Sequence, residues 1–168
     1  MIPIPGLSVI RIFWILLINI FILLSCQPSA RFRSPSGSAE PLRKANIGLL
    51  QREALRWIHT PYRLGGTDST GIDCSGLVQR IYATVYNLHM PREAAQQRAL
   101  GSSVDKRYLR PGDLLFFRFR GPGGINHVGI YLGEKRFLHA SSSRGVVISS
   151  LDDSYYRRHL IVARRYAH

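Results

Sequence analysis

The sequence predicts an α+β domain, with helices in its first half and an antiparallel β-sheet in its second half. Two observations lead to this prediction. Apolar residues recur at helical spacing between residues 42 and 100, whereas short β-rich runs separated by turn residues occupy residues 114–163. Helices followed by strands, without regular alternation, are typical of α+β domains. A chain of 168 residues suffices for one compact domain.

Three helices are expected in the first half. The first has apolar positions at helical spacing and ends at Thr60-Pro61. Those apolar positions are Ile47, Leu50, Ala54, Leu55 and Ile58. The second helix is expected from Cys74 to Tyr86, with Asp73 as its N-cap. Its buried residues would be Leu77, Ile81 and Val85. Pro91 precedes a third, short helix over residues 92–100.

The second half contains five β-rich runs bounded by turn residues. They lie at residues 114–117, 127–132, 136–140, 145–148 and 160–163. The turn Pro111-Gly112-Asp113 precedes the first of them. The runs are short and close in sequence, so we expect neighbouring strands to pair in antiparallel fashion.

The N-terminal residues 1–25 have the features of an export signal. Residues 12–24 are apolar apart from Asn19. This run is shorter than the ~20 apolar residues that a helix needs to cross a bilayer, and its length is typical of an export signal. Leu23-Leu24-Ser25-Cys26 resembles the bacterial lipoprotein signal. That resemblance implies cleavage before Cys26 and acyl chains on this residue, and Gln27 after it favours the outer membrane. A plain signal peptide or a short anchor with an incidental cysteine is the alternative.

Residues 26–41 are rich in Ser and Pro and are expected to form a flexible tether, so that the folded domain would cover residues 42–168. The net charge of +13 comes mostly from arginine and suits an anionic polymer, an anionic lipid surface or nucleic acid. An export signal does not fit nucleic-acid binding, which we therefore do not expect. We expect a monomer.

Cys74 is the candidate nucleophile. It stands at the predicted start of a helix, where free N–H groups and the helix dipole stabilise a thiolate. If Cys26 carries lipid, Cys74 is the one thiol left in the mature chain. A buried structural cysteine is the alternative interpretation. The backbone N–H groups at this helix start would also suit an oxyanion hole.

Two histidines lie in predicted strands and favour a catalytic interpretation. His127 begins one strand and His139 lies near the end of the next. Antiparallel pairing would bring both rings to one face, where His127 deprotonates Cys74 and His139 orients His127. His59, His89, His159 and His168 lack such a setting and are interpreted as surface residues. The spacing of Cys and His does not resemble a zinc site, and no metal or cofactor is expected.

Five motifs, taken in order, resemble the NlpC-type cell-wall cysteine peptidases. They are Thr60-Pro61-Tyr62-Arg63-Leu64-Gly65-Gly66, Asp73-Cys74-Ser75-Gly76-Leu77-Val78, Met90-Pro91-Arg92, residues 110–117 and residues 127–133. The resemblance covers residues 47–166 and implies a compact papain-like fold. It also implies hydrolysis of amide bonds in peptidoglycan stem peptides. The basic, glycine-rich residues 118–124 depart from the family pattern. They are expected to shape the substrate groove and so to affect the choice of substrate.

The resemblance also implies roles for individual residues. Cys74 would be the nucleophile, His127 the base and His139 the orienting residue. Tyr62 would support the oxyanion hole, Asp73 and Ser75 would contact the substrate, and Arg92 would be structural. The γ-D-glutamyl–diaminopimelate bond is the expected target. The D-alanyl–diaminopimelate cross-link and a non-catalytic wall- or lipid-binding lipoprotein are the alternatives. Either way, the sequence predicts a protein of the cell envelope, anchored through Cys26 and facing the periplasm.

Overall fold

The computed structural model describes residues 39–119 and 124–166. The expected signal, Cys26 and residues 26–38 of the expected tether lie outside these ranges. No helix within them is both long and apolar enough to cross a membrane. The helices are α2 (Ala39–Trp57), α3 (Cys74–Tyr86), α4 (Ala94–Ala99), a 3₁₀ turn (Lys106–Tyr108) and α5 (Ser154–His159). The strands are β1 (Thr67–Asp68), β2 (Gly71–Ile72), β3 (Ser102–Val104), β4 (Leu114–Phe117), β5 (His127–Gly133), β6 (Arg136–Ser141), β7 (Gly145–Ser150) and β8 (Leu160–Arg165).

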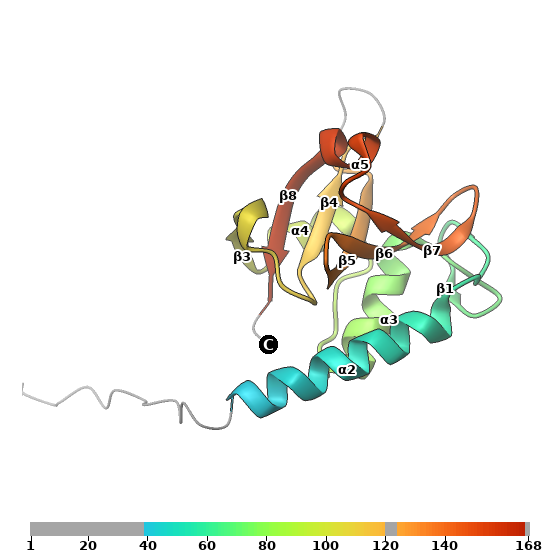
Figure 1. Cartoon of the computed structure of the whole chain (residues 1–168). Coiled ribbons are helices and arrows are strands. Elements are labelled where there is room, and N and C mark those ends of the chain that lie inside the picture. The colour runs from blue at the N-terminus through green and yellow to red at the C-terminus, as the bar shows by residue number, and fades with distance from the viewer. Residues whose placement is uncertain (1–38, 120–123, 167–168) are drawn as a thin grey trace, which may run out of the picture. The chain divides into compact units, whose positions relative to one another are not determined.

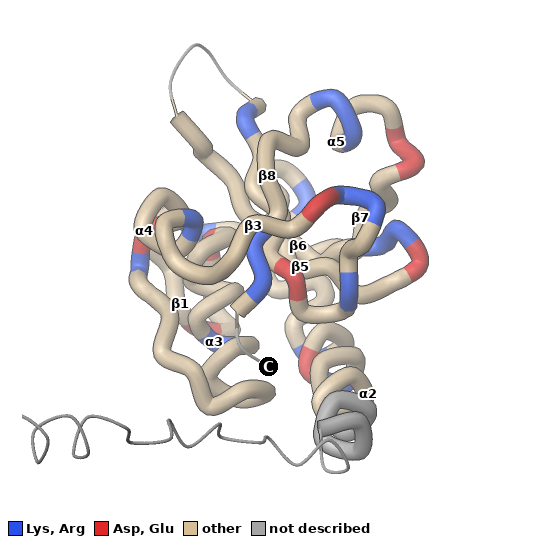
Figure 2. Tube along the Cα trace, turned by 90° about the vertical axis from the view of Figure 1, so that its left-hand side faces the viewer, with Lys and Arg blue, Asp and Glu red and all other residues tan. Residues whose placement is uncertain are grey.

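Six strands form one antiparallel sheet in the order β3-β8-β4-β5-β6-β7. Helices α2 and α3 lie side by side, and α3 packs on β5 and β6 (Figure 1). The short hairpin of β1 and β2 immediately precedes α3. The α+β prediction is therefore confirmed, with α2 and α3 on one face of the antiparallel sheet. Helix α5, whose last turn is basic (Figure 2), packs on the opposite face.

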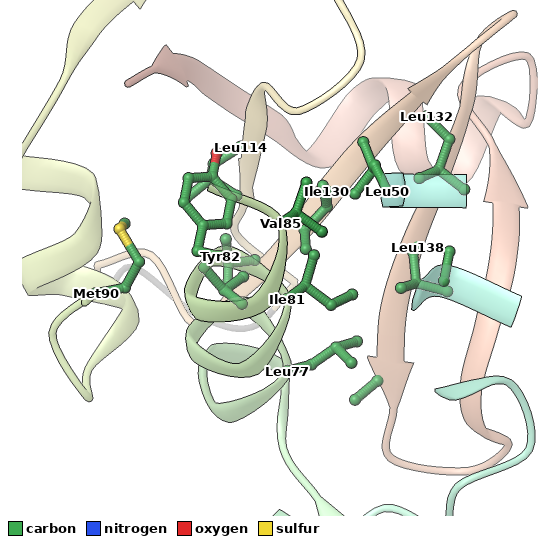
Figure 3. Close-up of a cluster of buried hydrophobic side chains, with 14 of the residues drawn as sticks. Leu50, Leu77, Ile81, Tyr82, Val85, Met90, Leu114, Ile130, Leu132 and Leu138 are labelled. Atoms are coloured by element: carbon green, nitrogen blue, oxygen red, sulfur yellow. The ribbon is translucent and has the colours of Figure 1, made fainter. Parts of the chain in front are cut away.

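The main core lies between α3 and the sheet. Leu77, Ile81 and Val85 of α3 are buried as predicted, and Figure 3 shows Ile81 and Val85 directed towards Ile130 on β5. The three α3 positions recur at intervals of four residues, which places them on one side of the helix. Burial of this stripe fixes the rotation of α3, and with it the direction in which its first residue, Cys74, faces.

Strand β4 is buried on both faces, which explains its uninterrupted apolar sequence. Leu114 and Phe116 belong to the main core. Leu115 and Phe117 belong to a second cluster on the opposite face, together with Tyr156 of α5. Successive strand residues point to opposite faces, so a central strand covered on both sides needs apolar residues at every position.

Most element predictions are confirmed, and three details are wrong or were missed. Helix α3 has the predicted bounds, whereas the third helix, expected over residues 92–100, covers only Ala94–Ala99 as α4. Leu55 was expected in the core, but its side chain is 67% exposed. Strands β1, β2 and β3 and helix α5 were not predicted, because each has six residues or fewer and no clear hydrophobic period.

The Pro111-Gly112-Asp113 turn has a structural role. Asp113 is fully buried, and both of its carboxylate oxygens accept hydrogen bonds from Arg165 on β8, each at 2.7 Å. The hydroxyl of Tyr82 on α3 donates to the carbonyl of Gly112. The turn therefore connects the helical layer to β8, the last strand in the chain.

Candidate active site

Cys74 is the first residue of α3 and carries a free thiol. Asp73 caps this helix, because its side chain accepts a hydrogen bond from the backbone N–H of Gly76 at 2.8 Å. Cys74 is half-buried and contacts the main core. The cap and the packed α3 stripe together hold the thiol at the helix start predicted from the sequence.

The environment of the thiol differs from the expectation in one respect. We expected the helix N-terminus to lower the pKa of Cys74, but burial raises this pKa. The charge of Asp73 raises it further, whereas the backbone N–H groups of Val128, Ser75 and Cys74 itself oppose the rise. Burial disfavours the charged form, so it outweighs the helix effect here. Val128 follows His127 directly, which places the start of β5 against the thiol.

His127 and His139 form a hydrogen-bonded pair on one face of the sheet. The Nε2 atom of His127 lies 2.9 Å from Nδ1 of His139, and the ring planes are nearly perpendicular. In the β5–β6 register Ile130 is opposite Leu138, so His139 lies diagonally across from His127. The sequence-based expectation that these two rings share a face agrees with this geometry.

The tautomers of this pair follow from the partners of His139. Its Nε2 atom lies 3.0 Å from Oγ of Ser149, and the Ser149 hydroxyl donates to the Tyr156 hydroxyl at 3.3 Å. Ser149 therefore accepts from His139, so the Nδ1 of His139 accepts from the Nε2–H of His127. This assignment leaves Nδ1 of His127 unprotonated, as a base requires.

Burial keeps both imidazoles neutral. It lowers the pKa of His127 to about 4. Burial also lowers the pKa of His139 to about 3, assisted by the neighbouring His127 and by the charge of Arg144. The raised pKa of Cys74 and the lowered pKa of His127 favour a neutral thiol and a neutral imidazole at pH 7.

Tyr62 lies near Cys74. It forms a parallel β-bridge with Ile72, two residues before Cys74. Burial raises the pKa of the Tyr62 hydroxyl, and the nearby Cys74 and Asp73 raise it further. Tyr62 therefore presents a protonated hydroxyl, a hydrogen-bond donor, next to the thiol.

Asp73 and Ser75 lie in a buried polar cluster with Arg92. The guanidinium of Arg92 contacts both Asp73 carboxylate oxygens, at 2.9 and 2.6 Å, and Oγ of Ser75 at 2.8 Å. Asp73 and Ser75 are 5% and 7% exposed. Arg92, interpreted as structural from the sequence, is thus the residue that binds both predicted substrate contacts.

An open cleft of about 470 Å³ adjoins the two histidines and Tyr62. Phe119 lines this cleft and belongs to residues 118–124, which the sequence analysis linked to fine specificity. Sequence reasoning missed four other lining residues, namely Asn126, Arg144, Tyr155 and Tyr156. Sequence reasoning also missed Ser149. In the β6–β7 register His139 is opposite Val147, and Ser149 lies two residues further along β7, on the same face of the sheet as Val147. Phe119 stacks on Tyr155 and also contacts the His127 ring.

Of the other described histidines, His159 alone approaches this pair, through Phe119, whose ring contacts both His127 and His159. His59 and His89 are exposed, as expected of surface residues. His159 is half-buried and packs against Phe119 and Tyr155. His168 lies outside the described residues. Within residues 39–119 and 124–166, no group of three or more His, Cys, Asp or Glu side chains could hold a metal ion.

A helix that begins with a free cysteine and packs on a sheet carrying a histidine pair defines the class of papain-like cysteine peptidase domains. The chain belongs to the NlpC/P60 family, whose sequence model matches residues 59–165. This family assignment confirms the resemblance seen in the five sequence motifs.

Three comparisons illustrate the relationship. The murein DD-endopeptidase MepS/murein LD-carboxypeptidase of Escherichia coli K12 is 46% identical over 109 residues, which are 65% of this chain and 57% of that protein. The gamma-DL-glutamyl hydrolase of Bacillus subtilis 168 is 41% identical over 123 residues, 73% of this chain and 30% of that protein. The crystal structure of an NlpC/P60 family protein from Bacillus cereus matches with a TM-score of 0.66 and 34% identity, over 71% of this chain and 40% of that chain. The chain thus spans little more than half the length of the first of these relatives.

Proposed function

We propose that the protein is a peptidoglycan hydrolase, a cysteine endopeptidase that cleaves amide bonds of murein stem peptides. The observation that carries this proposal is the position of Cys74 at the start of α3, against the strand that begins with His127. Family membership and relatives named for murein cleavage support the substrate class.

Because the Cys74 thiol and the His127 imidazole are both neutral before the reaction, the first proton transfer is from the thiol to the imidazole. Nδ1 of His127 takes the thiol proton as the Cys74 sulfur attacks the carbonyl carbon, and the backbone N–H of Cys74 and the hydroxyl of Tyr62 stabilise the oxyanion. The departing amine receives that proton from His127, which leaves a thioester on Cys74. Water then hydrolyses the thioester, with His127 again acting as base. His139 keeps the ring of His127 in the required orientation throughout.

Two bonds are candidates for cleavage. The relative named a DD-endopeptidase has the higher identity and favours the D-alanyl–diaminopimelate cross-link. The relative named a gamma-DL-glutamyl hydrolase favours γ-D-glutamyl–diaminopimelate, the bond expected from the sequence. We place the cross-link first on the basis of identity. Digestion of defined muropeptides, with the products identified by mass, distinguishes the two bonds.

The proposed envelope location rests on residues 1–26. The apolar residues 12–24 and the following Leu-Leu-Ser-Cys support cleavage before Cys26 and lipid attachment to it. The anchor would hold the domain at the outer membrane, facing the periplasm. Metabolic labelling with a fatty-acid probe tests this: the Cys26→Ala chain should lose the label, and retention of label would refute the anchor.

The test of the hydrolase is release of peptide fragments from purified wall sacculi. Cys74→Ala and His127→Ala should each abolish release, whereas His89→Ala, a change at an exposed histidine, should leave it unchanged. Undiminished release by the Cys74→Ala chain would refute the mechanism. If the unaltered chain binds sacculi but releases nothing, the protein is the non-catalytic wall-binding lipoprotein instead.

A further inference from the structure

The cleft beside the histidine pair is nearly free of charge. Tyr62, Phe119, Asn126, the neutral histidines and three serines line much of its surface. Of the described residues that line this cleft, Arg144 alone carries a full charge at neutral pH. One guanidinium among neutral side chains is an attractive site for an anionic group on the substrate, because none of the described residues that line the cleft carries a competing carboxylate.

Arg144 is held in place by the fold. It lies in the turn between β6 and β7, where its backbone N–H donates to the carbonyl of Ser141 at 3.4 Å. Next to it, Gly145 has a φ of +70°, and a Cβ there would approach the carbonyl oxygen of Thr60 to 2.4 Å. The Val146 N–H donates to the same carbonyl at 2.9 Å. The turn is therefore attached to the segment that leads directly into Tyr62.

The guanidinium of Arg144 is oriented by one hydrogen bond and keeps other N–H donors free to bind a ligand. Its Nη2 donates to the Tyr156 hydroxyl at 3.0 Å. Arginine has five N–H donors, and within the described residues no other side-chain hydrogen bond of Arg144 is formed. The exposed side chain thus has donors left for a ligand, with its direction set by Tyr156.

Stem peptides supply a matching anion at either candidate bond. A γ-D-glutamyl bond leaves the α-carboxylate of the glutamyl residue free, a few atoms from the scissile amide. A D-alanyl–diaminopimelate cross-link leaves the carboxylate of the acylated diaminopimelate centre close to the scissile amide too, on its amine side instead of its acyl side. Resting on the proposed function, we propose that Arg144 binds the stem-peptide carboxylate next to the scissile amide and selects carboxylate over carboxamide substrates. Bidentate pairing of guanidinium and carboxylate supplies both affinity and direction.

The link between Arg144 and the histidine pair supports this assignment. Tyr156 accepts a hydrogen bond from Arg144, and its hydroxyl also lies 3.5 Å from Nε2 of His139. The ligand site and the proton-transfer pair are therefore parts of one hydrogen-bonded group. A carboxylate bound at Arg144 is positioned relative to His127 through three side chains, namely Tyr156, Ser149 and His139.

The test uses the full chain and a matched pair of muropeptides, one with the free carboxylate and one with a carboxamide at that position. The unaltered chain should show a kcat/KM about tenfold or more higher for the carboxylate substrate. Arg144→Gln should lose this preference by losing activity on the carboxylate substrate alone, and Arg144→Lys should retain part of it. Arg136→Gln, which removes a charge paired with Glu134 outside the cleft, should keep the preference.

Equal loss on both substrates after Arg144→Gln, or no loss on either, would overturn the assignment. Dissociation constants for the same two muropeptides, measured in the Cys74→Ala background, separate this outcome from a failure of the proposed function. If the unaltered chain cleaves neither substrate, the hydrolase proposal fails, and the binding preference still decides the role of Arg144. Equal binding of both muropeptides by the Cys74→Ala chain would then refute it.

Discussion

Gly129 of β5 faces His139 of β6 so closely that a Cβ on Gly129 would lie 3.4 Å from the Cβ of His139. The same Cβ would lie 2.8 Å from the ring of Phe137 and 3.0 Å from the carbonyl oxygen of Leu138. The glycine in the His-Val-Gly motif is therefore required by space between the strands. It allows β6 to approach closely enough for the two histidine rings to meet.

Gly129→Ala should impair catalysis by displacing His139. The added methyl must push apart a packed strand pair, at a cost of about 1–3 kcal/mol in unfolding free energy. We expect kcat to fall more than this loss of stability explains at a temperature where the variant is folded. Urea denaturation and sacculus digestion measure the two effects. The matched change Gly124→Ala, where a Cβ meets nothing within 4 Å, should alter neither.

His139→Ala should lower kcat about a hundredfold and leave KM nearly unchanged, because it removes the acceptor that orients His127. His139→Asn, whose side-chain oxygen can accept the same hydrogen bond, should recover part of the rate. A purely structural role for His139 would instead give equal losses in both variants. Steady-state kinetics on a defined muropeptide checks this.

Ser149→Ala should produce a smaller loss in kcat, because it removes the acceptor for the Nε2–H of His139 and frees the tautomer. One neutral hydrogen bond contributes about 1 kcal/mol, so the expected decrease is about fivefold. Ser103→Ala, at an exposed position of β3 that does not line the cleft, is the control and should leave the rate unchanged. An unchanged rate for Ser149→Ala would contradict the tautomer assignment.

The pH dependence should reflect a neutral thiol and a neutral imidazole. Burial lowers the pKa of His127 to about 4, so the base is unprotonated above that pH, and kcat/KM should fall only as the pH approaches 4. Burial raises the pKa of Cys74 from the ordinary 9.0, so the alkylation rate with iodoacetamide should still be rising at pH 9. A plateau of alkylation below pH 7 would instead indicate a thiolate–imidazolium pair.

Asp73→Asn should destabilise the domain by about 1–3 kcal/mol, since it removes the charge from a buried pair with Arg92 and weakens the α3 cap. Burial alone would raise the pKa of Asp73, but the hydrogen bonds from Arg92, Gly76 and Gly65 outweigh it and lower this pKa. The stabilisation is therefore complete above the unfolded pKa of about 3.9 and is lost as the pH falls through the folded pKa.

Urea denaturation across pH measures this difference. Asp153→Asn changes an exposed N-cap on α5 that has no arginine partner, and it should cost under about 1 kcal/mol. If the two variants lose equal stability, the pair with Arg92 contributes nothing beyond the cap.

The sequence predicts the fold well where a long period or a motif is present. Helix α3 and strand β4 have the predicted bounds because each has a clear apolar pattern. Leu55 was misplaced because helical spacing alone does not show how wide a stripe the neighbouring helix covers. Helix α5 has six residues, too few for any period, yet it supplies Tyr156 to the site.

In the candidate site, too, some residues could be predicted from the sequence and others could not. His127 and His139 could be related to one another from strand order, because their spacing follows from adjacent antiparallel strands. Arg144, Ser149 and Tyr156 could not, since each acts through contacts between segments that no local pattern connects. The pKa of Cys74 was expected in the wrong direction because the depth of burial is a tertiary property that the sequence does not reveal.

The docking of α3 on β5 and β6 also determines when the proposed catalytic residues come together. The proposed nucleophile, Cys74, belongs to the helical layer and the proposed base, His127, to the sheet, so neither layer alone contains both residues. A chain in which only one layer has formed should therefore lack the proposed activity. Hydrolysis of a muropeptide thus provides an assay for completed folding, and its loss during gradual denaturation should coincide with separation of the two layers.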